Sequence, residues 1–436
     1  MTLPDAPALP WARGGRWYIV GLLLSLPLYV HVVGGGVRLA TGHAETRLVG
    51  FYFPLLLPLA GALIFVLRGG AGSRPRYSRE VRRLVFWLVF ALIAIYVSVT
   101  SGLYSSPNYP IVQALPFIAQ STLPLIFVVL LIARAPTDAQ RSGILRGFVD
   151  GSCLIATLLV GLRWVVAYDS HIGYPDDFGV VGIPSSLRFF PTVVAVAGGM
   201  GLYAWVHGTR RGLIALVTLG GAVSLVLYSH SRTALLVLAV AGMLTTGRLY
   251  RRSAVAFVGL NLALLLIAAA SITAGGATSV ERLVDGSGDS DANRLGRTLN
   301  SLTDSLREPF GRHFVPSEAV ETRAGVRITR VVTAENQFGT VGVSAGPLGL
   351  VSSLGVAASI VGLAVRGLRS SVEAQRVAAC GALCLTMTSL FQISLSHSLV
   401  GPLLGIMCWL TLDSGAPPSS ARSGLEPGVT MNKGAH

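Results

Sequence analysis

Charged residues are scarce in this chain, at 12% of its 436 residues, whereas hydrophobic residues make up 52%. With a mean hydropathy of +0.64, this composition excludes a water-soluble globular protein. Lysine occurs once, at position 433, so nearly all of the positive charge is arginine. All four cysteines lie in apolar runs, so they say nothing about the redox compartment.

Apolar runs fill most of the chain. A helix needs about 20 residues to cross about 30 Å of hydrocarbon, and twelve runs suit such spans. They lie near residues 17–33, 48–67, 84–104, 111–133, 147–168, 188–206, 212–228, 233–247, 254–274, 348–365, 377–394 and 398–412. The sequence therefore predicts an all-α integral membrane protein with about twelve transmembrane helices. No signal-peptide cleavage pattern follows the first run.

The gaps between these runs alternate between arginine-rich and arginine-poor. The arginine-rich gaps hold Arg68, Arg74, Arg76, Arg79, Arg82, Arg83, Arg134, Arg141, Arg146, Arg210, Arg211, Arg248, Arg251, Arg252, Arg366, Arg369 and Arg376. Because cytoplasmic loops concentrate arginine, these gaps and both termini are predicted to be cytoplasmic, with residues 413–436 as a disordered tail. The net charge of +14 then reflects topology and not nucleic-acid binding.

Residues 275–347 form one large gap that this alternation places on the outer side. Eight arginines and nine acids lie between Glu281 and Glu335. Because this segment is predicted to be on the outer side, its arginines are not explained by the usual excess of arginine in cytoplasmic loops. Between the spans of residues 1–274 and those of residues 348–412, the segment is predicted to form an external subdomain. Asp289 and Asp291 belong to a solvated turn at its start and not to a metal site, because the calcium-loop Gly and Glu are missing.

The outer segment has three parts. An amphipathic stretch with leucines at positions 295, 299, 302 and 306 predicts a helix along the membrane surface or over the bundle, ended by Pro309 and Gly311. A polar, irregular strip is expected to follow, up to Thr333. Residues 335–345 then read as a short apolar element with small residues, closed by Pro347, that dips toward the membrane.

Arg232 begins a predicted span directly after the short outer turn Ser229–Ser231. A guanidinium beside the free N–H groups of a helix start suits a phosphate or pyrophosphate, although an arginine near the interface also snorkels to lipid head groups. His230 adjoins this position and either helps to place substrate or is a polar turn residue. Arg163, inside a predicted span, suits the same anion or a structural ion pair.

Glu335 and Asn336 precede a predicted helix. Glu335 either stabilises that helix start electrostatically or, beside arginines, serves as a general base toward a hydroxyl. Arg188, at the outer start of another span, is a further candidate for the anion site.

Three of these stretches resemble, in order, signatures of the O-antigen ligase and O-antigen/exopolysaccharide polymerase superfamily. Ser231-Arg232-Thr-Ala-Leu-Leu resembles its Ser-Arg-x-x-x-apolar signature. Asn293-Arg294-Leu295 with Pro309-Phe310-Gly311 resembles its arginine-led amphipathic helix and Pro-x-Gly turn. Glu335-Asn336, nine residues and Gly346-Pro-Leu-Gly349 keep the spacing of its third signature but replace His with Glu.

The resemblance implies a GT-C-like glycosyltransferase of the bacterial inner membrane, without metal or other cofactor, that uses a polyprenyl-pyrophosphate-linked oligosaccharide and has a chain-length regulator as a further partner. Arg232 and Arg294 would stabilise the leaving pyrophosphate and Glu335 would deprotonate the acceptor, while bundle prolines, among them Pro116, Pro124 and Pro191, would open a groove for the lipid tail. The missing His favours a polymerase of repeat units over a ligase that moves a finished glycan. A flippase or transporter is the alternative of another class.

Overall fold

The computed structural model describes residues 78–165, 190–206, 212–229, 232–252, 299–315, 317–323, 326–332, 337–389 and 400–413, with isolated positions 19, 20, 23, 60, 254, 255, 258, 262 and 266. Several side chains inside these ranges are also not described, including those of Arg163, Arg232 and both strands. The predicted spans at 17–33, 48–67 and 254–274 therefore lie largely outside the described residues.

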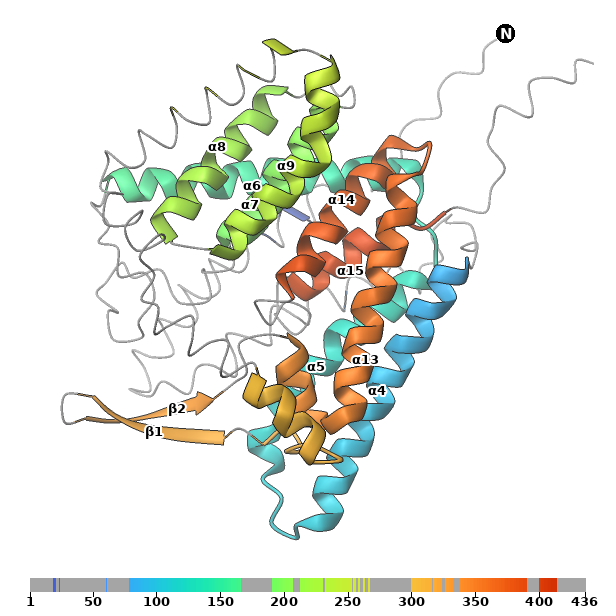
Figure 1. Cartoon of the computed structure of the whole chain (residues 1–436), viewed down its shortest axis with the longest axis vertical. Coiled ribbons are helices and arrows are strands. Elements are labelled where there is room, and N and C mark those ends of the chain that lie inside the picture. The colour runs from blue at the N-terminus through green and yellow to red at the C-terminus, as the bar shows by residue number, and fades with distance from the viewer. Residues whose placement is uncertain are drawn as a thin grey trace, which may run out of the picture.

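Helices dominate the described part of the chain (Figure 1). They are α4 (Arg79–Ser105), α5 (Ile111–Ile132), α6 (Asp138–Val165), α7 (Phe190–Val206), α8 (Gly212–Ser229), α9 (Arg232–Arg252), α13 (Gln337–Leu368), α14 (Glu373–Thr388) and α15 (Val400–Leu410). Each overlaps a predicted span. α6 starts at Asp138, well before its predicted span, because Thr137 and Gln140 form reciprocal caps: Gln140 N donates to Thr137 Oγ1 (3.2 Å) and Thr137 N to Gln140 Oε1 (2.9 Å).

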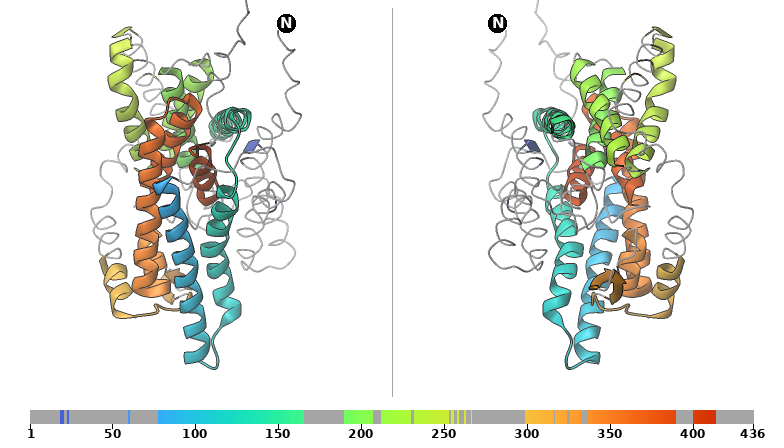
Figure 2. Two further views of the ribbon diagram at one scale, coloured as in Figure 1. Left: turned by 90° about the vertical axis from the view of Figure 1, so that its right-hand side faces the viewer. Right: turned by 90° about the vertical axis from the view of Figure 1, so that its left-hand side faces the viewer.

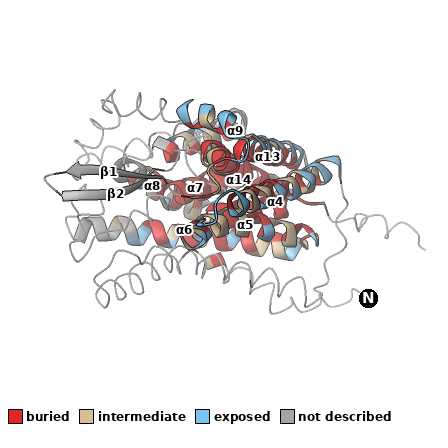
Figure 3. Ribbon diagram, turned by 90° about the horizontal axis from the view of Figure 1, so that it is seen from below, coloured by how far each residue is buried: buried red, intermediate tan, exposed pale blue. Residues whose placement is uncertain are grey.

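Two helices, Arg79–Ser105 and Gln337–Leu368, are long and apolar enough to cross a membrane. On α4 the face toward the bundle buries Leu84 and Leu88, yet the opposite face exposes Phe86 by 60% and Ile93 by 50%. A helix that is apolar all round suits a lipid environment, because in water its outer face would be polar. Figure 3 shows the same arrangement, with buried residues on α7 and α14 at the centre and exposed residues on α4 and α9 at the outside.

Close backbone packing holds the centre of the bundle together. Gly199 of α7 lies against Ala241 of α9, and Gly198 of α7 against Leu219 of α8. A Cβ on Gly381 of α14 would lie 2.5 Å from the Met200 sulfur of α7. In lipid no hydrophobic force drives apolar helices together, and small residues let their backbones pack closely. α6 crosses this group steeply and is seen nearly end-on in Figure 2, where α4 and α13 stand upright.

α13 is two helices joined at Gly346, whose φ of 68° and ψ of −162° break the helix before Pro347. A Cβ on Gly349 would lie 2.7 Å from Val341 O, and one on Gly342 would lie 3.3 Å from Leu350 Cβ. Residues eight apart in a straight helix are about 12 Å apart, so the first helix folds back along the second. The predicted short apolar element is thus a helix that ends at Gly346 and packs against the second helix, while its dip toward the membrane stays a prediction.

Residues 317–332 correct the prediction of an irregular strip. β1 (Ser317–Arg323) and β2 (Val326–Val332) pair antiparallel, with Ser317 opposite Val332 and Arg323 opposite Val326, and the hairpin projects from one side of the bundle (Figure 1). The described part of the chain is therefore helical apart from one hairpin. Valines, threonines and an isoleucine in the two strands favour extended backbone, a signal that the interspersed charges concealed.

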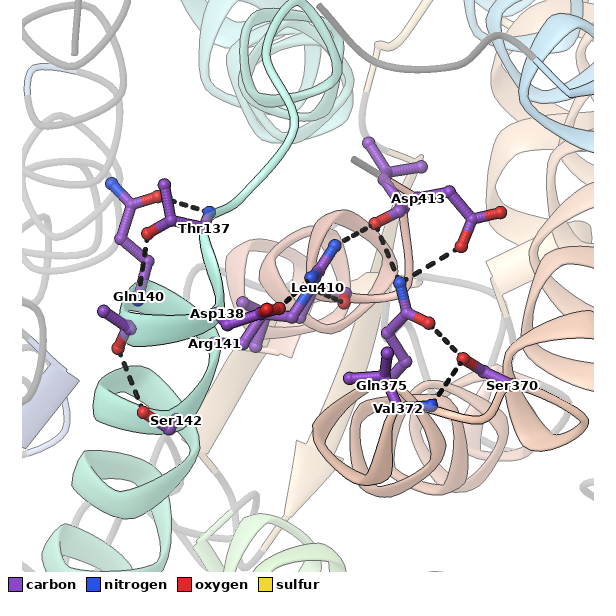
Figure 4. Close-up of polar contacts among 12 residues, drawn as sticks. Thr137, Asp138, Gln140, Arg141, Ser142, Ser370, Val372, Gln375, Leu410 and Asp413 are labelled. Carbon is purple, nitrogen blue, oxygen red and sulfur yellow. Dashed lines mark hydrogen bonds and ion pairs between the residues drawn. The ribbon is translucent and has the colours of Figure 1, made fainter. Parts of the chain in front are cut away.

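Polar contacts join the ends of α4, α6, α13, α14 and α15, called here the arginine-rich end, and Figure 4 shows those around Arg141 and Gln375. Arg141 of α6 is 1% exposed and donates from Nε to Leu410 O (3.1 Å), from Nη2 to Leu412 O and from Nη1 to Asp138 Oδ1 (2.5 Å). The last carbonyls of a helix lack partners within it, so Arg141 caps α15. The network continues as Gln375 Nε2 donates to Leu412 O (3.2 Å) and Arg366 pairs with Glu80 (2.7 Å) and Asp413 (3.2 Å).

Arg141→Met keeps much of the side-chain volume but removes the side-chain donor of Leu410 O and one of the two donors of Leu412 O. We expect the free energy of unfolding to fall by about 2–3 kcal/mol, measured by thermal unfolding of the protein in lipid nanodiscs. Arg146→Met, at an exposed position of the same helix, is the control and should leave the unfolding midpoint unchanged. Equal midpoints for both variants would show that the Arg141 contacts contribute nothing to stability.

Candidate functional site

The starts of α7 and α9 lie at the same level in the bundle. Gly199 packs on Ala241, and each residue lies nine positions after the first residue of its helix, since 199 − 190 = 9 and 241 − 232 = 9. Nine residues of helix rise by about 13 Å. Phe190 and Arg232 therefore lie side by side at the end of the bundle away from the arginine-rich end.

α13 begins and α14 ends at this same level. Met200 of α7 contacts Gly381 of α14, and eight residues in opposite directions lead to Thr192 and Ser389. The N–H of Gln337, the first residue of α13, donates to Ser389 O at 3.3 Å. We call this group, consisting of Phe190, Thr192, Arg232, Gln337 and Ser389, the helix-start cluster.

Three helix starts, those of α7, α9 and α13, meet here beside the ends of α8 and α14, so the positive ends of three helix dipoles outnumber the negative ends of two. The first turn of a helix has N–H groups without intrahelical partners and the positive end of the helix dipole, an arrangement that binds phosphate and other anions. α8 ends at Ser229 and α9 begins at Arg232, which confirms the predicted short turn and places Arg232 in the first turn of its helix. The sequence predicted one such start, but not that three meet.

The cluster is recessed within the bundle. Gln337 lies nine residues from Gly346, where α13 turns back, so about 13 Å of helix separates the cluster from that turn. Its described polar residues are buried: Thr192 and Ser389 are both 0% exposed and Gln337 is 2% exposed. The sequence prediction missed Thr192 and Ser389. The one available signal was Pro191, since proline is common in the first turn of a helix.

The Pro309-Phe310-Gly311 motif and the Gly346-Pro-Leu-Gly349 motif meet where α13 turns. Gly311 (φ 68°) and Gly346 are in backbone contact, since a Cβ on Gly346 would lie 2.5 Å from Pro309 O and one on Gly311 the same distance from Gly346 N. Arg312 N donates to Val343 O at 2.8 Å. One close backbone contact thus explains why both Gly311 and Gly346 are glycine. We call this contact the tip junction (residues 308–314 and 343–347).

α4 clamps the tip junction from the other side. The Ser98 hydroxyl donates to Phe310 O (2.8 Å) and Ser344 O (2.9 Å). His313 Nδ1 lies 2.8 Å from Ser98 O, which fixes the Nδ1–H tautomer because a carbonyl only accepts. The Tyr109 hydroxyl donates to His313 O, and burial raises the pKa of Tyr109, so the phenol stays a donor at neutral pH.

The chain is helical from 299 to 307 and turns at Pro309, as predicted. Its polar side faces the bundle: Ser301 and Ser305 are buried, and Ser305 Oγ meets Gly342 of α13. Leu299 and Leu306 are instead exposed, by 54% and 67%. Apolar residues on the outer side suit a helix that lies on a membrane surface.

Most side chains of the predicted site lie outside the described residues. The backbone places Arg232 in the cluster and Arg163 near the end of α6, while Arg188, His230, Arg294, Glu335 and Asn336 are not described. Pro191 lies in the first turn of α7, which begins at Phe190. Pro116 and Pro124 lie within α5, where Pro124 lines a small apolar cavity with Leu88 and Ile360.

Within the described ranges, no three His, Cys, Asp or Glu side chains gather to hold a metal ion. No protein-family model and no curated protein matches this chain.

Proposed function

We propose that this protein is a membrane glycosyltransferase that joins polyprenyl-pyrophosphate-linked oligosaccharide repeat units. The observation that carries the proposal is the helix-start cluster, in which α9 with Arg232 begins beside the starts of α7 and α13. Three helix starts and an arginine at the end of an apolar bundle suit a lipid-anchored diphosphate.

The arginine distribution supports the orientation. Arg79, Arg141, Arg366 and Arg376 lie at the end opposite the cluster, and the arginine-rich side of a membrane protein is cytoplasmic. The cluster then opens toward the outer face of the bacterial inner membrane, where flipped repeat units are present. The exposed leucines of the 299–307 helix suit the outer surface of that membrane.

Glu335 would supply the base. It precedes Gln337 by two residues, so its Cα lies within about 7 Å of that of Gln337, which is bonded to Ser389 in the cluster. The acceptor hydroxyl gives its proton to Glu335 as its oxygen bonds to the anomeric carbon. The bond between that carbon and the pyrophosphate oxygen breaks, and its electron pair leaves with the pyrophosphate, whose charge Arg232 and Arg294 stabilise.

A deletion strain complemented with variants tests this function. Glu335→Gln should abolish the glycan ladder while single attached repeats remain, because the base is lost and the protein still folds. Glu308→Gln changes an exposed carboxylate at the tip junction and should give normal ladders. Both are measured by gel profiling, with membrane levels of the variants checked by immunoblot.

The same gels separate the alternatives. Loss of all attached glycan in the deletion strain would replace the polymerase with a ligase, and repeat units trapped on the cytoplasmic leaflet would replace it with a flippase. Normal ladders with Glu335→Gln would remove Glu335 from the mechanism.

A further inference from the structure

Thr192 has a buried hydroxyl without a partner. The residue is 0% exposed and, within the described part of the chain, its Oγ1 makes no hydrogen bond. Leaving a buried hydroxyl unpaired costs about 1–3 kcal/mol, so its retention in an apolar bundle points to a partner that binds there.

Other buried threonines of the bundle bond to their own helix. Thr218 Oγ1 donates to Ile214 O (2.8 Å), Thr245 Oγ1 to Ala241 O (2.9 Å) and Thr386 Oγ1 to Ala382 O (2.7 Å). Each uses the carbonyl four residues earlier. Thr192 is the third residue of α7, and the carbonyl four positions earlier, that of Arg188, lies outside the described residues.

Helix geometry directs the Thr192 side chain toward the start of α9. Thr192 lies seven residues before Gly199 and so on the same face of α7, because seven residues make almost two turns. Gly199 packs on Ala241, and seven residues before Ala241 is Ala234, in the first turn of α9. Since side chains lean toward the start of their helix, the Thr192 hydroxyl faces the turn that begins with Arg232.

Ser152 and Ser389 also have unpaired buried hydroxyls. Ser152 lies midway along α6, away from the helix starts. Ser389 lies eight residues after Gly381 and is rotated by about 80° from the face of α14 that meets α7. Thr192 is therefore the residue of the three that is both in a first helical turn and directed at the first turn of α9.

We propose that the Thr192 hydroxyl is a further binding residue for the diphosphate, donating a hydrogen bond to a phosphate oxygen that Arg232 also contacts. This inference rests on the proposed function for the identity of the ligand, a lipid-linked diphosphate. The ligand chemistry follows from the surroundings: a hydroxyl donor, a guanidinium and the N-termini of α7 and α9 all favour an anionic oxygen acceptor.

Binding of inorganic pyrophosphate to the full-length protein in nanodiscs tests the inference without turnover. Thr192→Val removes only the hydroxyl and should weaken binding about tenfold or more, as for loss of a hydrogen bond to a charged group. Thr192→Ser keeps the hydroxyl and should restore most of the affinity. Thr245→Val, which removes a paired buried hydroxyl at the other end of α9, should leave the affinity unchanged.

The thermal unfolding midpoint of Thr192→Val without ligand gives a second measurement. Because Thr192→Val replaces an unpaired polar group by a methyl group of the same shape, its unfolding midpoint without ligand should rise. A lowered midpoint with unchanged pyrophosphate affinity would overturn the inference, since the hydroxyl would then be structural. Weakened pyrophosphate binding together with normal glycan ladders would uphold the anion site and refute the proposed function instead.

Discussion

Arg232→Met is expected to lower the rate of glycan transfer by about 10²–10³-fold, the usual effect of removing a group that stabilises transition-state charge. Arg232 starts α9 beside the starts of α7 and α13, where little water competes for the leaving pyrophosphate. Arg232→Lys keeps the charge but not the bidentate geometry, so we expect an intermediate loss. The measurement is single-turnover consumption of lipid-linked repeat units in membrane vesicles.

Arg146→Met serves as the control, because it removes an exposed arginine from α6 near the arginine-rich end. Full activity is expected for this variant. If Arg232→Met kept the wild-type rate at equal protein levels, Arg232 would be a residue of the lipid interface and the proposed anion site would have to be abandoned.

Gly346→Ala is expected to lower the free energy of unfolding by about 3–5 kcal/mol, combining backbone strain with overpacking. The φ of 68° and ψ of −162° at Gly346 suit only glycine, and a Cβ would lie 2.5 Å from Pro309 O and 2.7 Å from Glu308 O. Because both neighbours are backbone atoms, relief requires the two halves of the tip junction to separate.

Gly362→Ala on the same helix is the matched control. Nothing lies within 4 Å of a Cβ at Gly362, and alanine in a helix gains about 0.5–1 kcal/mol over glycine. The two unfolding midpoints in nanodiscs should therefore move in opposite directions. A midpoint for Gly346→Ala at or above that of wild type would show that the junction is not held as the structure describes.

Local signals were sufficient to predict much of the bundle. The apolar run at 111–133 became α5 at Ile111–Ile132, and Gly346-Pro347 indicated the break in α13. Polar first turns were missed, as at Asp138, because a helix extends beyond its apolar run once its cap is satisfied. The β-hairpin was missed because its β-branched residues alternate with charges.

The candidate site was harder to predict, because it depends on packing between distant segments. The sequence marked Arg232 as the start of a span, but its position beside α7 and α13 follows from Gly199 on Ala241 and from Gln337 on Ser389. Thr192 carries no motif. Its importance follows only from its burial and from the lack of a carbonyl partner in its own helix.

The unequal lengths of α4 and α14 have a consequence for the surrounding lipid. The apolar run of α4 (residues 84–104) is about 32 Å long, whereas all 16 residues of α14 span about 24 Å, so α4 matches about 30 Å of hydrocarbon and α14 falls short of it. Such hydrophobic mismatch is relieved by tilt or by local thinning of the bilayer. Reconstitution into thinner or thicker membranes would therefore change how deep below the head groups Ser389 lies, and acyl-chain length becomes a control on access to it.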